Sequence, residues 1–159
     1  RQRRMTDVID SDEASAIERG ALRLLASRDH TRLELRRKLA RHNDEGQIGP
    51  VLDDLERRRL LSDARFAENY VRQRSRRGYG PLRLRAELTD KGVDHALAAR
   101  YIEDGAVDWS VLLLEVATRK FGDAPATDRQ GLARRGRFLQ QRGFPVSLVG
   151  QYLDRVRAF

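Results

Sequence analysis

Residues 72–92 read Arg-Gln-Arg-Ser-Arg-Arg-Gly-Tyr-Gly-Pro-Leu-Arg-Leu-Arg-Ala-Glu-Leu-Thr-Asp-Lys-Gly and predict two helices joined by a sharp turn. Basic residues up to Arg77 suit the end of the first helix, because cations offset the negative end of a helix dipole. Gly78 and Gly80 permit backbone angles that larger residues resist. Pro81 suits the first turn of the second helix, where its missing N–H is not needed. A basic elbow between two helices therefore lies near the middle of the chain.

The second helix of this stretch carries one apolar stripe, formed by Leu84 and Leu88 four positions apart. Gly92 fits the left-handed stop that commonly follows a helix. The stretch holds seven basic and two acidic residues, so it carries more than half of the chain's net charge of +8. We therefore expect it to bind an anionic partner.

The composition is that of a folded chain with a small core and much charged surface. Of the 159 residues, 40% are hydrophobic and 35% are charged, and the isoelectric point is near 10.7. Such basicity favours nucleic acid or an acidic protein surface as partner, although it also serves solubility. The absence of cysteine excludes disulfides and thiolate metal sites and fits a reducing cytoplasm. No apolar run is long enough to span a membrane, and the chain shows no signal-peptide pattern.

Landmarks recur along the chain with a period near 50 residues. The equivalent positions in three predicted middle helices are Leu35 and Leu39, Leu84 and Leu88, and Arg135 and Leu139. The second members of these pairs are separated by 49 and 51 residues. The sequence Lys-Gly-Val at 91–93 then matches Arg-Gly-Phe at 142–144. Because no window alternates like a strand, the pattern predicts an all-α protein of three tandem three-helix repeats in an elongated, curved, solenoid-like body.

The repeat sets the expected division of the chain. We expect a flexible N-terminal segment over residues 1–12 and three-helix repeats over 13–62, 63–107 and 108–159. The first helix is expected to begin near Glu13, since few apolar anchors precede it.

Local signals predict several further helix starts. Thr31 and Glu34 match a capping box. Residues 42–46 read as a loop, after which Pro50 is expected to open a short helix. The expected N-caps of three later helices are Asp63, Asp94 and Asp108.

The sequence lacks the patterns of the common catalytic sites. The three histidines, His30, His42 and His95, show no metal-ligand spacing. No serine lies in a nucleophile elbow, and no P-loop is present to hold a triphosphate. We therefore predict a protein that is not an enzyme and that uses no cofactor or metal.

Basic residues on the predicted helices form the candidate binding face. Its members are Arg36, Arg37, Lys38, Arg72, Arg74, Arg76, Arg77, Arg83, Arg85, Lys91, Arg119, Lys120, Arg134, Arg135 and Arg137. If they occupy matching repeat positions, they form a stripe that contacts backbone phosphate or an acidic protein groove rather than base edges. The alternative for each cluster is an ordinary solvated face.

The segments around the elbow resemble a known family. Leu61-Ser-Asp-Ala-Arg-Phe-Ala-Glu-Asn-Tyr-Val-Arg-Gln-Arg and the stretch from Arg77 to Val93 resemble the core signature of the bacterial RecX family. Residues 27–39 and 108–122 extend the resemblance, which spans roughly residues 17–159.

The resemblance implies a cytoplasmic modulator of the RecA recombinase, with a part in recombination, DNA repair and the SOS response. It implies three tandem three-helix repeats that lie along the groove of the RecA–DNA filament and suppress its ATPase, strand-exchange and co-protease activities. It also implies direct binding of single- or double-stranded DNA by some members, and it supplies no catalytic residues. We expect a monomer.

Two other functions remain open at this stage. Three-helix units with basic residues also occur in helix-turn-helix transcriptional regulators, although no unit has an obvious base-reading helix. The third possible function is that of a solenoid that binds proteins and makes no contact with DNA. Sequence preference in footprinting would favour the regulator, and RecA binding that survives charge reversal would favour the protein-binding solenoid.

Overall fold

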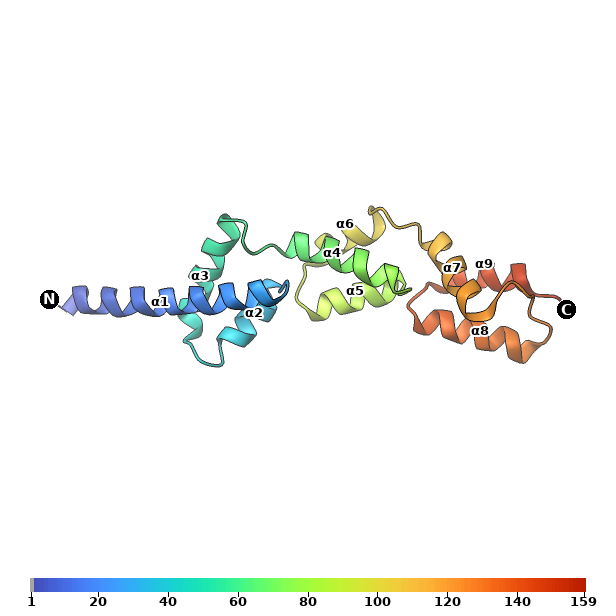
Figure 1. Cartoon of the computed structure of the whole chain (residues 1–159), viewed down its shortest axis with the longest axis horizontal. Helices are drawn as coiled ribbons and strands as arrows, with labels where there is room; N and C mark the ends of the chain where they lie inside the picture. Colours follow the sequence, from blue (N-terminus) through green and yellow to red (C-terminus); the bar gives the residue numbers. More distant parts are fainter. Residues whose placement is uncertain (1) are drawn as a thin grey trace. The chain divides into compact units, whose positions relative to one another are not determined.

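The computed structural model describes residues 2–159, with the side chains of residues 11–159. The helices of this part are α1 (Gln2–Ser27), α2 (Arg32–Leu39), α3 (Glu45–Arg57), α4 (Asp63–Arg76), α5 (Pro81–Asp90), α6 (His95–Glu103), α7 (Trp109–Phe121), α8 (Arg129–Gln141) and α9 (Val146–Val156) (Figure 1). The only extended pairing in the described residues is an isolated parallel bridge between Ala126 and Arg157. The all-α prediction is confirmed, and the expected overall shape stays a prediction.

The chain divides into two compact units. Unit 1 comprises residues 1–66 with 91–93, and unit 2 comprises residues 67–90 with 94–159. In unit 1, α1 packs against α2 and α3. Its core is formed by Ile17, Ala21, Leu35, Leu39, Ile48, Val51, Leu52, Leu55 and Leu61. The i, i+4 leucines that mark α2 in the sequence are both buried there.

Two helices of unit 1 begin earlier than predicted. Helix α1 starts at Gln2, so it runs through the segment expected to be flexible, apart from residue 1, which lies outside the described residues. Helix α3 starts at Glu45, within the predicted loop, and Pro50 lies inside it. The reason is the side chain of Asp44, which accepts a hydrogen bond from the Gly46 N–H and caps the helix ahead of the proline.

The predicted capping box is confirmed. The Thr31 hydroxyl accepts from the Glu34 N–H at 3.1 Å, and the Glu34 carboxylate accepts from the Thr31 N–H at 3.1 Å. The cap predicted at Asp63 is wrong: the Ser62 hydroxyl accepts from the Arg65 N–H at the start of α4. Asp63 instead accepts from the Arg32 N–H at 2.8 Å, at the start of α2.

The two remaining predicted caps differ from each other. Asp108 caps α7 by accepting from the N–H groups of Ser110 and Val111, as predicted. Asp94 occupies the N-cap position of α6 but makes no side-chain capping bond.

Unit 2 packs α5 against α6, and α7, α8 and α9 against one another. The core of the last three helices consists of Leu113, Val116, Ala117, Leu139, Phe144, Val149 and Tyr152. Leu84 and Leu88, the predicted stripe of α5, are fully buried. Pro81 is the first residue of α5, as predicted.

Within unit 2, the turn before α5 lies against the turn before α9. The Gly80 N–H donates to the Arg142 carbonyl at 2.7 Å, and the Leu82 N–H donates to the Gly143 carbonyl at 3.0 Å. A Cβ on Gly80 would lie 2.5 Å from the Gly143 carbonyl carbon. Gly143 has φ of +98°, and a Cβ there would overlap Arg83. Two glycines thus allow two backbones to touch.

Unit 1 contains a related pairing of turns. The Thr31 hydroxyl donates to the Lys91 carbonyl at 2.6 Å. Gly92 has φ of +82°, as predicted, and a Cβ there would overlap Leu33. The Lys-Gly and Arg-Gly pairs that recur in the sequence therefore form equivalent turns. The turn at Lys91 and Gly92 contacts the start of α2, and the turn at Arg142 and Gly143 contacts the start of α5.

Candidate functional site

Three arginines of unit 2, two from the elbow and one from the turn before α9, surround one tyrosine ring. The guanidinium carbons of Arg74, Arg83 and Arg142 lie 4.0, 4.4 and 4.8 Å from the centroid of the Tyr79 ring. Arginine stacks favourably on an aromatic face through its planar cation. Arg142 also donates to the Arg77 carbonyl at 3.1 Å, which ties the turn before α9 to the end of α4. Much of the elbow's basic charge therefore holds the turn together.

Glu87 anchors the same arginines. Its carboxylate accepts from Arg74 Nη2 at 2.9 Å, from Arg83 Nε at 3.0 Å and from the Tyr70 hydroxyl. Burial alone would raise the pKa of Glu87, but these hydrogen bonds outweigh it and lower the pKa to about 2. Burial and the Glu87 carboxylate raise the pKa of Tyr70 to about 12. Arg74 and Arg83 are thus already paired within the protein.

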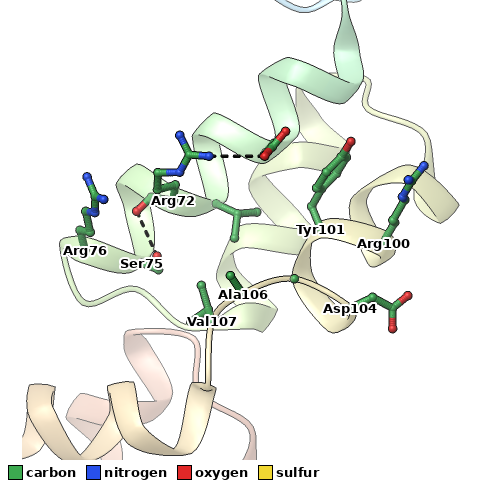
Figure 2. A pocket seen from close by; sticks show the side chains of 11 residues that line it. Arg72, Ser75, Arg76, Arg100, Tyr101, Asp104, Ala106 and Val107 are labelled. Atoms are coloured by element: carbon green, nitrogen blue, oxygen red, sulfur yellow. Dashed lines mark hydrogen bonds and ion pairs between the residues drawn. The ribbon is translucent and has the colours of Figure 1, made fainter.

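A groove in unit 2 is lined by residues of α4, of α6 and of the segment that follows α6. It has a volume of about 480 Å³ and is lined by Glu68, Val71, Arg72, Ser75, Arg76, Arg100, Tyr101, Asp104, Gly105, Ala106 and Val107. Figure 2 shows Arg72, Ser75 and Arg76 coming from α4, and Arg100 and Tyr101 from α6. A second hollow of about 240 Å³ shares Ser75, Arg76 and Val107 with it and extends to Arg119 on α7. Arg76 therefore borders both hollows.

The arginines of this groove are more available than those of the elbow. Arg76 and Arg119 are exposed and form no ion pair among the described residues. Arg72 pairs with Glu68 at 3.4 Å, but both side chains are about half exposed, so the pair is weak. The guanidinium of Arg100 lies 5.7 Å from the centroid of the Tyr101 ring. Sequence reasoning missed Arg100 and Tyr101, because only the folded arrangement of α4 and α6 around one groove brings them near the predicted arginines.

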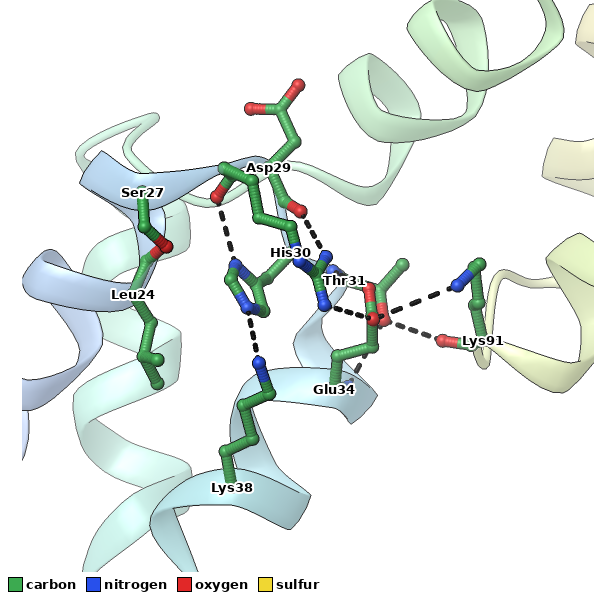
Figure 3. Close-up of polar contacts among 9 residues, drawn as sticks. Leu24, Ser27, Asp29, His30, Thr31, Glu34, Lys38 and Lys91 are labelled. Atoms are coloured by element: carbon green, nitrogen blue, oxygen red, sulfur yellow. Dashed lines mark hydrogen bonds and ion pairs between the residues drawn. The ribbon is translucent and has the colours of Figure 1, made fainter. Parts of the chain in front are cut away.

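Unit 1 divides its predicted basic residues in the same way. Arg36 and Arg37 are exposed on α2 and form no ion pair among the described residues. Lys38 lies 3.0 Å from Nε2 of the buried His30, and Lys91 lies 3.9 Å from Glu34 (Figure 3). Arg36 and Arg37 are therefore available to a partner, whereas Lys38 and Lys91 contact residues of the protein itself.

His30 is held in its neutral form. Its Nδ1 lies 2.9 Å from the Arg28 carbonyl oxygen, which can only accept a hydrogen bond, so Nδ1 carries the proton and donates. Nε2 then has no proton and accepts a hydrogen bond from the Lys38 ammonium. Burial and the neighbouring cations Arg28 and Lys38 lower the pKa of His30, against the raising effect of its backbone hydrogen bond and of Glu34. This histidine is a structural residue of the turn before α2.

Arg135 does not belong to the candidate face. It is only 7% exposed, its guanidinium donates to the Tyr152 hydroxyl at 3.1 Å and to the Ala124 carbonyl at 2.8 Å, and it lies over the Phe121 ring. The repeat already places it at the position of the buried Leu35 and Leu84. That alignment was the signal for a core residue.

The other predicted residues lie on helix surfaces. Arg77, Arg134 and Arg137 are exposed and form no ion pair within the described part of the chain. Lys120 is exposed and lies 5.4 Å from the centroid of the Phe138 ring. Arg85 forms an ion pair with Glu103.

The described residues offer no acidic or histidine cluster of the kind that binds metals. No group of three or more such side chains with that potential occurs among them. Within the same residues, no helix combines the length and the apolar character needed to cross a membrane.

Family models match all three helical repeats. The first, second and third three-helix domains of RecX match residues 21–55, 62–102 and 111–153. The chain belongs to the RecX family. The three-helix repeat predicted from the 50-residue period is therefore confirmed, and it is the RecX repeat.

Relatives and solved structures agree with this assignment. The regulatory protein RecX of Halorhodospira halophila is 44% identical over 137 residues, which cover 86% of this chain and 85% of the relative. The regulatory protein RecX of Pseudomonas savastanoi pv. phaseolicola is 40% identical over 144 residues, which cover 90% of this chain and 93% of the relative.

Two crystal structures of RecX proteins have the same fold. RecX from Lactobacillus salivarius matches with a TM-score of 0.74 at 24% identity, over 92% of this chain and 97% of its own. A second regulatory protein RecX matches with a TM-score of 0.82 at 20% identity, over 97% of this chain and 79% of its own.

Proposed function

We propose that this RecX-family chain is a negative regulator of the RecA recombinase. It binds the RecA–DNA filament through exposed arginines, in the cytoplasm and as a monomer, and it acts by binding rather than by catalysis. A protein that binds one filament state more tightly than another shifts the filament toward that state. Occupation of the filament groove would also compete with an incoming DNA strand. Both effects lower ATPase, strand-exchange and co-protease activity.

The observation that carries this proposal is a set of exposed arginines that form no ion pair among the described residues. Among the predicted residues, they are Arg36 and Arg37 in unit 1 and Arg76, Arg77, Arg119, Arg134 and Arg137 in unit 2. Since no carboxylate neutralises them, their charge is available to phosphates or to acidic side chains of a partner. Arg74 and Arg83, which share Glu87, contribute less than their number in the sequence suggests.

Cosedimentation with RecA filaments tests the proposal. RecA is assembled on single-stranded DNA with a non-hydrolysable nucleotide, and the fraction of the chain that sediments with it is measured over a range of salt concentrations. The unmodified chain is expected to sediment with filaments and to remain in solution without them. The proposal is wrong if the sedimenting fraction is the same in both cases.

Charge removal then locates the contact. The double variant Arg76→Gln with Arg119→Gln is expected to bind filaments more weakly, with a salt slope about 1.4 smaller if each arginine contacts one phosphate of the single strand. The control Arg23→Gln removes an exposed charge from α1 that has no ion-pair partner among the described residues. An equal loss in the control would mean that net charge, and not these positions, drives binding.

A further inference from the structure

We propose that the groove lined by α4 and α6 binds single-stranded nucleic acid, with one unstacked base against Tyr101 and the flanking phosphates on Arg76 and its neighbours. This inference rests on the proposed function, because it names the ligand of one of the surfaces through which we propose that the chain acts. It concerns direct contact with the strand, which can be measured without RecA.

The shape of the groove suits a base. Its volume is about 480 Å³, within the range of pockets that hold small organic groups. Val71, Ala106 and Val107 supply apolar lining, and Tyr101 supplies a half-buried aromatic ring. Figure 2 shows Tyr101 and Arg100 as neighbours, and the guanidinium carbon of Arg100 lies 5.7 Å from the centroid of the Tyr101 ring. Aromatic rings bind unpaired bases by stacking, and cations beside the ring strengthen the contact.

The charges around the groove suit a sugar–phosphate strand. Arg72, Arg76 and Arg100 line the larger hollow, and Arg76 and Arg119 line the smaller one that continues from it. Cations therefore line both hollows, as the binding of a phosphate backbone requires. Arg76, which borders both hollows and has no ion-pair partner among the described residues, is placed to hold the phosphate between two successive nucleotides.

Two carboxylates in the lining distinguish this ligand from an acidic peptide. Glu68 and Asp104 both line the larger hollow. They would repel the side chains of an acidic peptide, whereas the amino groups of bases donate hydrogen bonds to carboxylates. A ligand that carries negative charge on its backbone and N–H donors on its bases satisfies both kinds of side chain. A duplex does not, because its bases are stacked and paired.

The binding test uses the full chain and a short fluorescein-labelled single strand of mixed sequence, measured by fluorescence anisotropy without RecA. Tyr101→Leu keeps an apolar side chain but removes the ring, and we expect its affinity to fall by about 5-fold to 100-fold, the range of base–aromatic stacking. Tyr101→Phe is expected to bind as the unmodified chain does. Arg76→Gln is expected to lower the salt slope by about 0.7, and the control Arg129→Gln, an exposed charge outside the groove, to leave the dissociation constant of the strand unchanged.

Photo-crosslinking locates the base independently of affinity. A strand substituted with 5-iododeoxycytidine is irradiated with the chain, and the crosslinked peptide is identified by mass spectrometry. The crosslink is expected at Tyr101, with competition by unlabelled single strand but little by duplex or polyglutamate. Crosslinking elsewhere, equal competition by duplex or polyglutamate, or unchanged affinity of Tyr101→Leu would overturn the inference. None of these outcomes depends on RecA, so cosedimentation with RecA filaments remains a separate test of the proposed function.

Discussion

Glu87 is the residue on which the elbow of unit 2 depends most. Its side chain is 23% exposed and receives hydrogen bonds from Arg74, Arg83 and Tyr70. Two of these donors also stack on Tyr79. The loss of the Glu87 charge therefore weakens both the hydrogen bonds and the stacking.

Glu87→Gln is expected to destabilise the protein by about 1–3 kcal/mol at pH 7, the range for hydrogen bonds to charged groups. The pKa of Glu87 is about 2 in the fold, against an ordinary value of 4.5. Its contribution is therefore complete above about pH 4.5 and is lost as the pH falls toward 2. Urea unfolding of both proteins at several pH values checks this. A stability difference that does not shrink in acid would contradict the assigned role.

His30 is expected to make stability fall with falling pH in the same direction as Glu87, but in a higher pH range. Because its pKa is lowered from 6.5 in the fold, the unfolded chain takes up the proton first as the pH falls. Stability is therefore expected to fall below about pH 6.5, by up to about 1.4 kcal/mol per pH unit. His30→Gln cannot titrate, so its unfolding free energy should depend less on pH between 7 and 5. Equal pH dependence of the two proteins would show that His30 does not carry the effect.

At the scale of elements, contacts between turns organise the repeats. The turn before α5 and the turn before α9 share two backbone hydrogen bonds in unit 2. They approach this closely because both carry glycine where a side chain would collide. The helices are thus fixed by their ends as well as by their apolar faces.

Gly143→Ala is expected to destabilise the protein by about 2 kcal/mol or more, because the new methyl group meets Arg83 and φ is +98°. Gly150→Ala is the matched control. It lies inside α9 with open space around a Cβ, so alanine is expected to stabilise the helix by about 0.5–1 kcal/mol. Thermal and urea unfolding measure both changes. If Gly143→Ala is as harmless as its control, the contact between the two turns is not structural.

The sequence predicts those elements whose signals are local. The capping box at Thr31, the start of α5 at Pro81 and the left-handed turn at Gly92 follow from neighbouring residues and are confirmed. The predicted start of α3 at Pro50 is wrong, because the Asp44 side chain caps the helix six residues earlier in the sequence. Helix α1 starts earlier than predicted, at Gln2, and the local sequence signals do not account for this extension.

The candidate site was less predictable than the fold. Charge in the sequence identifies arginines but not their partners, so Arg74 and Arg83 were assigned to a binding surface although Glu87 engages both. Tyr101 carries no local signal, since its place in the groove depends on how the fold positions α6 relative to α4. Arg135 was predictable as a core residue, because the repeat itself aligns it with buried leucines.

At the scale of the whole molecule, family membership and charge support the same function. All three three-helix domains of RecX are present in order. The chain carries a net charge of +8. Some of its arginines stabilise turns, and others form no ion pair among the described residues. The predicted members of the second group, which include Arg76 and Arg119 but not Arg23, are the residues through which we propose that the chain regulates RecA.

The steady-state ATPase rate of RecA on single-stranded DNA, with the chain titrated in, tests this central claim most directly. The rate is expected to fall as the chain is added, and Arg76→Gln with Arg119→Gln is expected to require a higher concentration for the same inhibition, whereas Arg23→Gln is not. An ATPase rate that stays constant at every ratio of the unmodified chain to RecA would contradict the claim.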